Sequence, residues 1–446
     1  MLFKLKLMAI ACTACVSFAS QAEDLLDIYK EAFMRDPIVL QAKAQRDQAF
    51  AAIDEQQAAL LPQIDVLGSL SASHTSVTDY GVNGDNKAAT IGIGLSQSLW
   101  RHSSWINKTI AEKNAAVADL AYNDALQNLI IRVSYAYFNV LNASDSLKYQ
   151  KANNEALKRQ LDEAERRFQV GLIAETDRME AQAAYDLSKA QVITAENNLT
   201  NSYEAIRALI GRVVTVDNLD KLDAKKFSTP YVNSTLKALI KLAEENNLML
   251  QQAIVSRDIA KDQIRLAQTG HEPTLDLVAN AQTGYTDYKN EVPGTTLNDG
   301  NAWTQSIGIN LNVPIYHGGA VSSKVSQAEH NYVAKSEALE YQHRSLVSNV
   351  NNGYNNVNAA ISSVSAYNQT VKSAASALEA TKAGYEVGTR TMTDVLNATQ
   401  KYYNAMQMQA DSRYKYIESR LDLLYYQGLL KVTDIEQINS GLKKTK

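Results

Sequence analysis

The residue types that most often perform chemistry are few and widely spaced in this sequence. Its six histidines include no H-E-x-x-H pair that would bind zinc. His317-Gly318-Gly319 has the form of an esterase oxyanion loop, but neither a G-x-S-x-G nucleophile motif nor a phosphate-binding loop accompanies it. We therefore expect no catalytic residue, no metal and no cofactor, and the chain is not expected to be an enzyme.

The first 22 residues have the pattern of a secretory signal peptide. Two lysines precede an apolar run, and small residues flank a cleavage site after Ala22. Both cysteines, Cys12 and Cys15, fall inside this segment. We therefore expect an exported chain without disulfide bonds, thiol catalysis or a cysteine-bound metal.

The charge and hydropathy of the remaining chain exclude two further classes. The chain has 44 basic residues, and without the two lysines of the signal peptide 42 stand against 48 acidic ones, a net charge of −6. There is no basic stripe with interleaved aromatic residues, so nucleic acid is not an expected partner. No apolar run reaches the roughly 18 residues of a transmembrane helix. A periplasmic, an extracellular and an outer membrane β-barrel location remain open.

One turn sequence occurs twice. "FQVGLIAETDRMEAQ" spans residues 168–182 and "YEVGTRTMTDVLNAT" spans residues 385–399, which places Gly171 and Gly388 217 positions apart (388 minus 171). Other segments match at offsets of 211, 216 and 217, and the offset changes at the strand-like pieces, where loops tolerate insertions. The sequence thus predicts a duplicated unit, with copies at residues 23–210 and 235–428, a connector at 211–234 and a C-terminal segment at 429–446.

Each copy contains two segments of alternating apolar and small polar residues, which predict β-strands. The ranges are about 64–75, 88–100, 274–287 and 303–316. The alternation suits a membrane barrel whose wall faces lipid on one side and water on the other, although a soluble sandwich could give the same alternation. Trp100, Trp303 and Tyr316 stand at strand ends, as the aromatic residues of a membrane girdle do. A barrel needs about eight strands, so several chains would have to share one. The strand number allows two, three or four chains.

Long helices dominate the rest of each copy. Residues 104–168 and 319–384 carry apolar positions at alternating steps of four and three, which is coiled-coil spacing. Shorter helices are expected at about 24–61, 176–210, 235–272 and 393–427. Each short pair has about the length of one long helix, so we expect one long helix to run beside two short helices stacked end to end. An ordinary helical bundle is the alternative.

In these features the chain resembles the TolC family of outer membrane export channels. The order of elements, the "VGL" and "VGT" tips, the strand starts "LLPQIDV" and "PTLDL" and the segment "NVPIYHGG" carry the resemblance, which covers essentially the whole mature chain. It implies a mainly α-helical fold with a small membrane β-barrel. Four strands per chain would contribute to a shared, trimeric, twelve-stranded barrel, and the coiled-coil helices would form a periplasmic tunnel.

The resemblance also implies a function and partners. The chain would be the exit duct of tripartite multidrug efflux and type I protein secretion systems, in the outer membrane with a large periplasmic part. It would act as a homotrimer in outer membrane lipid, and it would engage a periplasmic adaptor and an inner membrane RND-type pump or ABC transporter. A periplasmic coiled-coil adaptor or scaffold is the alternative, although adaptors are expected to show β-rich modules around a single hairpin.

The resemblance assigns roles to residues near the second tip. It implies that Tyr385 bonds Asp177 and that Arg390 bonds Thr176 and Asp177 on neighbouring hairpins, which closes the tunnel. It also implies a constriction ring at Asp394. The family's second acid position is occupied by Asn397, so one charged ring would be missing.

Two further interpretations concern the tips themselves. Thr176 and Thr393 stand where a helix restarts, so each could be a helix N-cap with a favourable aspartate in the first turn. The resemblance places adaptor docking at the exposed turns. The docking residues expected are Val170, Gly171, Leu172, Val387, Gly388 and Thr389.

Overall fold

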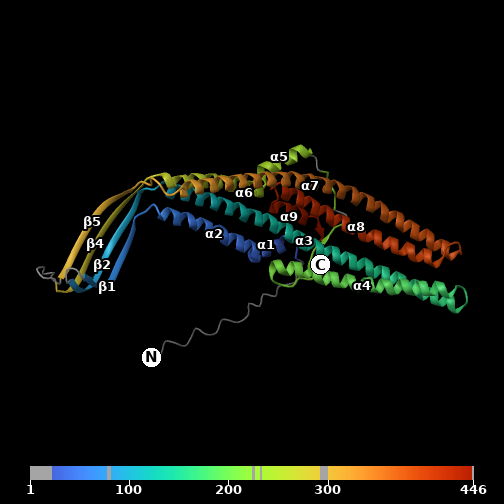
Figure 1. The fold of residues 1–446 in the computed structure, drawn as a ribbon. Coiled ribbons are helices and arrows are strands. Elements are labelled where there is room, and N and C mark those ends of the chain that lie inside the picture. Colours follow the sequence, from blue (N-terminus) through green and yellow to red (C-terminus); the bar gives the residue numbers. More distant parts are fainter. Residues whose placement is uncertain (1–22, 78–81, 224–226, 232–233, 292–299, 444–446) are drawn as a thin grey trace, which may run out of the picture. The chain divides into compact units, whose positions relative to one another are not determined.

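The structure is a computed structural model that describes residues 23–77, 82–223, 227–231, 234–291 and 300–443 (Figure 1). The predicted signal peptide lies outside these residues. In chain order the elements are α1 (Leu25–Arg35), α2 (Pro37–Ala58), β1 (Gln63–Val77), β2 (Val82–Trp100), α3 (His102–Gln169), α4 (Glu175–Ile210), η2 (Val216–Asn218), β3 (Lys221–Leu222), α5 (Leu236–Asn246), α6 (Leu248–Gln268), η3 (Thr269–His271), β4 (Thr274–Glu291), β5 (Gly300–Asn312), α7 (Ala320–Glu386), α8 (Met392–Tyr426), α9 (Val432–Asn439) and β6 (Leu442–Lys443).

The predicted fold class, mainly α-helical with a small β portion, is confirmed. The long helices α3 and α7 contain 68 and 67 residues, and each turns back into a helix about half as long, α4 with 36 and α8 with 35 residues. The strand ranges agree with the sequence pattern, except that β5 ends at Asn312, so Tyr316 lies beyond the strand.

The chain divides into two compact units. The first contains Met1–Leu40, Ala125–Asn247 and Leu346–Lys446, and its described part carries both helical hairpins with α1, α5 and α9. Its core surrounds the middle of α3, where Tyr137 and Phe138 are fully buried. The Tyr137 hydroxyl donates to the carbonyl of Asp220 at 2.7 Å, which ties the connector to α3. A two-stranded pairing of β3 with β6 joins the connector to the C-terminal segment.

The second unit contains Gln41–Asp124 and Leu248–Ser345, and it holds the four-stranded sheet. The strands are antiparallel in the order β1-β2-β4-β5. Ion pairs fasten the helices of this unit to one another and to the sheet. They join Arg46 to Asp119 at 2.5 Å, Lys113 to Asp262 at 2.6 Å and Arg101 to Asp276 at 2.8 Å.

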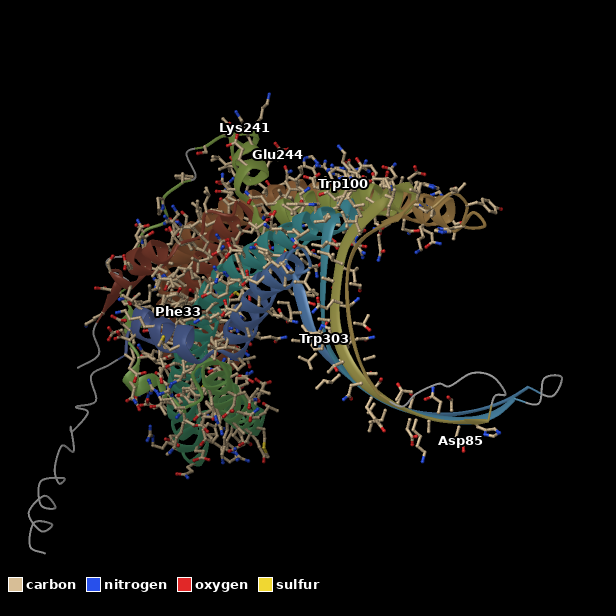
Figure 2. All side chains as sticks on the ribbon, turned by 90° about the vertical axis from the view of Figure 1, so that its left-hand side faces the viewer. Phe33, Asp85, Trp100, Lys241, Glu244 and Trp303 are labelled. Carbon is tan, nitrogen blue, oxygen red and sulfur yellow. The ribbon has the colours of Figure 1, made fainter. Side chains whose placement is uncertain are left out.

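One face of the sheet is apolar and open. Register pairs such as Val66 with Ile93 and Leu277 with Ile309 point to this face, because directly opposed residues share a side. Leu70 is 88% exposed and Ile307 is 78% exposed. Trp303 lies on β5, and Asp85 lies near the start of β2 (Figure 2). An exposed apolar face of this extent marks a surface that meets another molecule or a membrane.

The opposite face of the sheet is mostly small and polar, and two of its glycines are required for a steric reason. A Cβ atom added to Gly92 would lie 2.8 Å from Cβ of its register partner Gln282, and one added to Gly284 would lie 2.7 Å from Cγ2 of Thr90. Each glycine therefore makes room for the polar side chain across from it.

The structure corrects the prediction of one continuous helix at 24–61. Helix α1 ends at Asp36, which has extended backbone (ψ 121°), and Pro37 then starts α2. Proline cannot continue a helix but suits its first position. The buried Asp36 carboxylate accepts a hydrogen bond from the backbone N–H of Val39 at 3.0 Å and two from Arg132 at 2.7 and 2.8 Å. The break is therefore fastened to α3 by a two-pronged ion pair.

The predicted helix at 235–272 is broken in the same way. Asn247 has extended backbone (ψ 120°) between α5 and α6, and it stands 211 positions after Asp36 (247 minus 36). Its Nδ2 donates to the carbonyl of Tyr426 at 3.0 Å, at the end of α8. Both copies thus contain a non-helical joint at matching positions, held by an Asx side chain.

Candidate functional site at the hairpin tips

The two hairpin turns have the same backbone geometry. Gly171 and Gly388 have φ of +72° and +78°, a region that favours glycine. The N–H of the next residue bonds back to the carbonyl five residues earlier, from Leu172 to Arg167 at 2.9 Å and from Thr389 to Gly384 at 2.8 Å. This is the Schellman closure of a helix end. The sequence match thus reflects one turn that the chain builds twice.

Both tips are exposed and partly apolar. Val170, Leu172 and Val387 are each more than two-thirds exposed. A Cβ atom added to either tip glycine would meet nothing within 4 Å. The glycines are therefore required by their backbone conformation and not by lack of space.

The helices that follow the tips are capped differently, which corrects the expected N-caps. Helix α8 is capped by Thr391, whose hydroxyl accepts from the backbone N–H of Asp394 at 3.2 Å, so Thr393 lies inside the helix. Helix α4 follows Ala174 without a side-chain cap, and Thr176 lies in its first turn. Thr391 and Thr393 both precede Asp394 within three residues, and the sequence alone does not show which of them is the N-cap.

The Asp394 carboxylate completes a capping box. It accepts from the backbone N–H of Thr391 and from its hydroxyl, both at 3.0 Å. These hydrogen bonds lower the pKa of Asp394, and the positive charge of Arg390 acts in the same direction. Asp394 is therefore a fixed negative charge at the start of α8. Asn397, one turn further, is exposed.

The expected bond between Tyr385 and Asp177 is not made within one chain, although the Asp177 charge acts to raise the pKa of Tyr385. The guanidinium carbon of Arg167 lies 4.7 Å from the centre of the Tyr385 ring. The Tyr385 hydroxyl is buried and has no hydrogen-bond partner by geometry among the described residues. Burial raises the pKa of Tyr385, and Arg167 opposes that rise. Arg167 lies near enough to donate to this hydroxyl, but the hydroxyl itself donates to no residue in the described part of the chain.

The other expected gate residues are also not joined within the chain. Arg390 is exposed, and no hydrogen bond or ion pair connects its side chain to Thr176 or Asp177 in the described part of the structure. The backbone N–H of Asp177 donates to the carbonyl of Ala174 at 3.2 Å in the first turn of α4. Arg390 and Asp177 therefore both have side-chain charges available to a neighbour.

A contact that sequence reasoning missed joins the two hairpins. The hydroxyl of Thr393 on α8 donates to the carboxylate of Glu180 on α4. Glu180 follows Asp177 by three residues and so lies near it on the helix surface, which is the only sequence signal for this pair. The two tips of one chain are thus linked by polar as well as apolar contacts.

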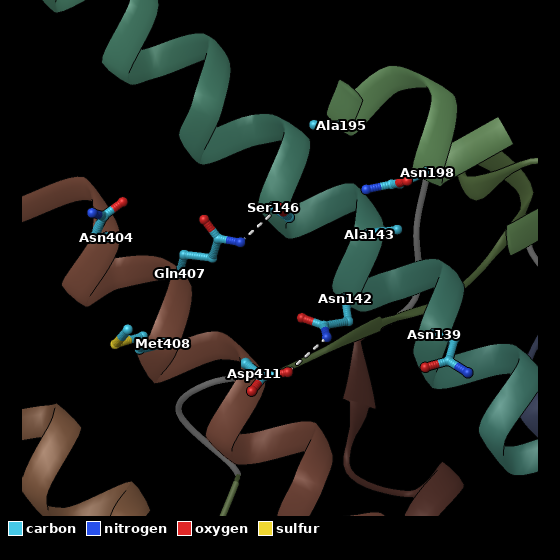
Figure 3. Close-up of a pocket in the computed structure, with 10 residues that line it drawn as sticks. All are labelled: Asn139, Asn142, Ala143, Ser146, Ala195, Asn198, Asn404, Gln407, Met408 and Asp411. Atoms are coloured by element: carbon cyan, nitrogen blue, oxygen red, sulfur yellow. Dashed lines mark hydrogen bonds between the residues drawn. The ribbon is translucent and has the colours of Figure 1, made fainter. Parts of the chain in front are cut away.

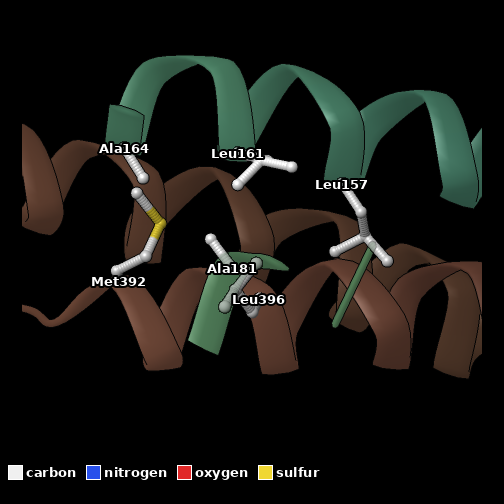
Figure 4. Close-up of a cluster of buried hydrophobic side chains, with 6 residues drawn as sticks. All are labelled: Leu157, Leu161, Ala164, Ala181, Met392 and Leu396. Atoms are coloured by element: carbon white, nitrogen blue, oxygen red, sulfur yellow. The ribbon is translucent and has the colours of Figure 1, made fainter. Parts of the chain in front are cut away.

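An apolar cluster lies directly behind the tips (Figure 4). Ile173 packs against it from the first turn and Tyr385 from the end of α7. The cluster draws on α3, α4 and α8, so the end of the first hairpin and the start of α8 share one small core. Its buried members are Leu157, Leu161, Ala164, Ala181, Met392 and Leu396.

A polar cavity of about 470 Å³ lies further from the tips between the same three helices (Figure 3). Asn142 donates to Asp411 at 2.9 Å and Gln407 donates to Ser146 at 3.0 Å, so these four polar side chains are paired with one another. No group of three histidine, cysteine or acidic residues in the described ranges could hold a metal ion. Within those same ranges, no helix is both long and apolar enough to cross a bilayer.

Together the fold and the tips define a class of protein, a duplicated chain in which long helical hairpins are joined to strands with an open apolar face. The chain matches the outer membrane efflux protein family over residues 28–212 and 239–428, and it belongs to that family.

Individual relatives agree with this family. The chain is 43% identical over 434 residues to outer membrane protein TolC of Escherichia coli, which covers 96% of this chain and 87% of TolC. It is 27% identical over 430 residues to the proteases secretion protein PrtF of Dickeya chrysanthemi, covering 94% of this chain and 91% of PrtF. The crystal structure of the Campylobacter jejuni CmeC outer membrane channel has the same fold, with a TM-score of 0.78, 18% identity and coverage of 94% and 90% of the two chains.

Proposed function

We propose that this chain forms the outer membrane exit duct of tripartite drug efflux and type I protein secretion systems. The observation that carries the proposal is the combination of an open apolar sheet face with two long helical hairpins in one chain. The apolar face suits lipid, and the small polar face suits a wet interior. Family membership and the similarity to TolC and PrtF support both the outer membrane location and the export role.

Three copies would complete the duct. Four strands are too few for a closed barrel, and the sheet has free edges at β1 and β5 in its described part. Twelve strands from three chains would pair these edges and leave none open in lipid. The helical hairpins would then form a tunnel in the periplasm, with the tips at its inner end.

The tips would form both the gate and the docking surface. Within the described chain the Arg390 side chain forms no ion pair and the Tyr385 hydroxyl donates to no residue, which supports partners on a neighbouring chain, at Thr176 and Asp177. Three Asp394 side chains, with Asn397 beside them, would face the narrow opening. The exposed turns around Gly171 and Gly388 would receive a periplasmic adaptor, which engages an inner membrane RND-type pump or ABC transporter. Duct and gate would act by passage alone, as in the channel proteins of this family, and no catalytic step is assigned to them.

Single-channel recording tests the proposal. Purified protein added to a planar lipid bilayer should give discrete, cation-selective conductance steps, and outer membrane fractions should contain a heat-sensitive trimer. A protein that stays in the soluble periplasmic fraction and produces no conductance would instead be a coiled-coil adaptor or scaffold.

A further inference from the structure

A second, smaller cavity lies between the two hairpins of one chain. It has a volume of about 220 Å³, is lined by α3, α4 and α8 beside the tip cluster, and is open to solvent on the side of Ala183 and Leu187. Its walls combine leucines with polar groups. Leu157, Leu187 and Leu396 contribute apolar surface, and Asn153, Glu180 and Asn397 contribute polar atoms.

Asn153 is the polar group in this cavity that most needs a partner. Its side chain is 3% exposed, and its Oδ1 is buried with no hydrogen bond to any described residue. The adjacent Asn154, by contrast, donates to the hydroxyl of Ser188 at 2.8 Å. Buried acceptors are nearly always satisfied by protein, water or a ligand. A donor from outside the chain is therefore expected at Asn153.

Glu180 gives the cavity its charge. It is the only charged residue in the lining, and its carboxylate accepts a hydrogen bond from Thr393. Within the part of the chain that the structure describes, no lysine or arginine forms an ion pair with Glu180. A carboxylate has about four lone-pair sites, so it can accept a second, charged donor. The cavity thus combines one negative charge, on the exposed residue Glu180, with one buried acceptor at Asn153 and an apolar wall.

We propose that this cavity binds a small amphipathic amine. Its ammonium group would donate to Glu180 and Asn153, and its apolar body would cover the leucines. Charge-assisted hydrogen bonds are stronger than neutral ones, so the charge selects a cation over a neutral analogue. Because the lining comes from α4 of the first copy and α8 of the second, a bound amine holds the two hairpins together. In the proposed duct, this would oppose opening of the tunnel. That consequence rests on the proposed function, whereas the binding itself does not.

Three probes of similar size and different charge test the binding. Phenethylamine, phenethyl alcohol and phenylacetate are titrated into the purified full chain in detergent at pH 7 and followed by calorimetry. The amine should bind about tenfold more tightly than the alcohol, and the acid should not bind. Glu180→Gln should make the affinities for the amine and the alcohol equal. Glu175→Gln removes the same charge from α4 outside the cavity and should leave the preference unchanged.

A variant that fills the cavity tests the location without altering its charge. Ala183 lines the cavity and is exposed, so Ala183→Trp can place an indole in it. Loss of amine binding with an unchanged unfolding temperature supports the site. Unchanged affinity in this variant, equal affinity for all three probes, or no binding at millimolar concentration would each overturn the proposal. The last outcome would mean that water alone satisfies Asn153.

Discussion

At Asp36 a single carboxylate ends one helix, starts the next and fastens both to a third. Burial raises the pKa of Asp36, but the hydrogen bonds from Arg132 and from the Val39 N–H outweigh it, and the pKa is lowered from its ordinary value of 3.8. A lowered pKa means that this contribution to stability is fully present above pH 3.8 and is lost as the pH falls through the lowered value. The joint should therefore hold at neutral pH and loosen in strong acid.

Removal of this carboxylate should be among the most damaging single changes in the chain. Asp36→Ala leaves the Arg132 charge partly buried without its partner and should lower the free energy of unfolding by roughly 3–5 kcal/mol. Asp36→Ala combined with Arg132→Met should recover part of that loss. Denaturant unfolding of the single and double variants measures both effects. A double variant as unstable as the single one would show that the joint depends on capping alone.

A second prediction concerns ions at the proposed opening. Three Asp394 carboxylates close together would attract cations, and multivalent cations added from the periplasmic side should block the pore. Asn397 carries no charge at the neighbouring ring, so Asn397→Asp should make the block tighter. Asn397→Gln keeps the amide and serves as the control. Equal block in all three proteins would show that Asn397 does not line the constriction.

At the scale of elements, the hairpin tips are the feature most open to test. Gly171→Arg and Gly388→Arg should leave the trimer intact but abolish drug resistance, because a large side chain would keep a docking helix away from the exposed turn. Gly171→Ala and Gly388→Ala introduce the same strain at positive φ, roughly 1–2 kcal/mol each, without the bulk. Drug-resistance assays should therefore show a loss of resistance in the arginine variants and normal resistance in the alanine variants. Resistance lost in both would indicate strain as the cause, and resistance kept in the arginine variants would exclude docking at the tips.

Most elements were predictable because their patterns are local. Alternation of apolar and small polar residues predicted the strands, and apolar residues at steps of four and three predicted the long helices. Glycine predicted the turns at the tips. The joints at Asp36 and Asn247 were missed because helix-forming residues continue on both sides of each. Pro37 was a usable signal in the first copy, but Leu248 in the second gives none. The cap at Thr391 was missed because Thr393 is equally good by residue type.

At the scale of the whole molecule, closure of the tunnel should depend on contacts between chains. Tyr385→Phe combined with Arg390→Ser should give a folded trimer with higher conductance that admits large antibiotics. Hydrogen bonds to charged groups contribute about 1.5–3 kcal/mol each, and a switch from 1:99 to 99:1 requires about 5.5 kcal/mol. Links repeated in three chains are therefore large enough to hold a closed state and small enough for a docked adaptor to release.

The single chain supplies the control for this experiment. Because the Tyr385 hydroxyl has no hydrogen-bonded partner among the described residues, Tyr385→Phe alone should not lower the unfolding temperature. Single-channel recording and antibiotic sensitivity measure the gating effect separately. Unaltered conductance in the double variant would mean that the closed state is held elsewhere.

Contacts between distant segments could not be predicted from this one sequence. The Thr393–Glu180 link and the cavity at Asn153 join α3, α4 and α8, and their side chains come from segments far apart in the sequence. Local patterns place residues on a helix, but they do not determine which helix comes to lie beside it. The resemblance to a family implied gate residues for the same region, but not this pair.

The two free edges of the sheet have a consequence for inheritance. Each pore would need an intact β1 edge and an intact β5 edge from all three chains. A head-to-tail ring closes only when β1 of every chain pairs with β5 of its neighbour. In a cell that makes equal amounts of intact and edge-damaged chains, random mixing would leave roughly one pore in eight free of damage. Edge mutations should therefore be genetically dominant, whereas mutations that prevent the chain from folding at all should be recessive.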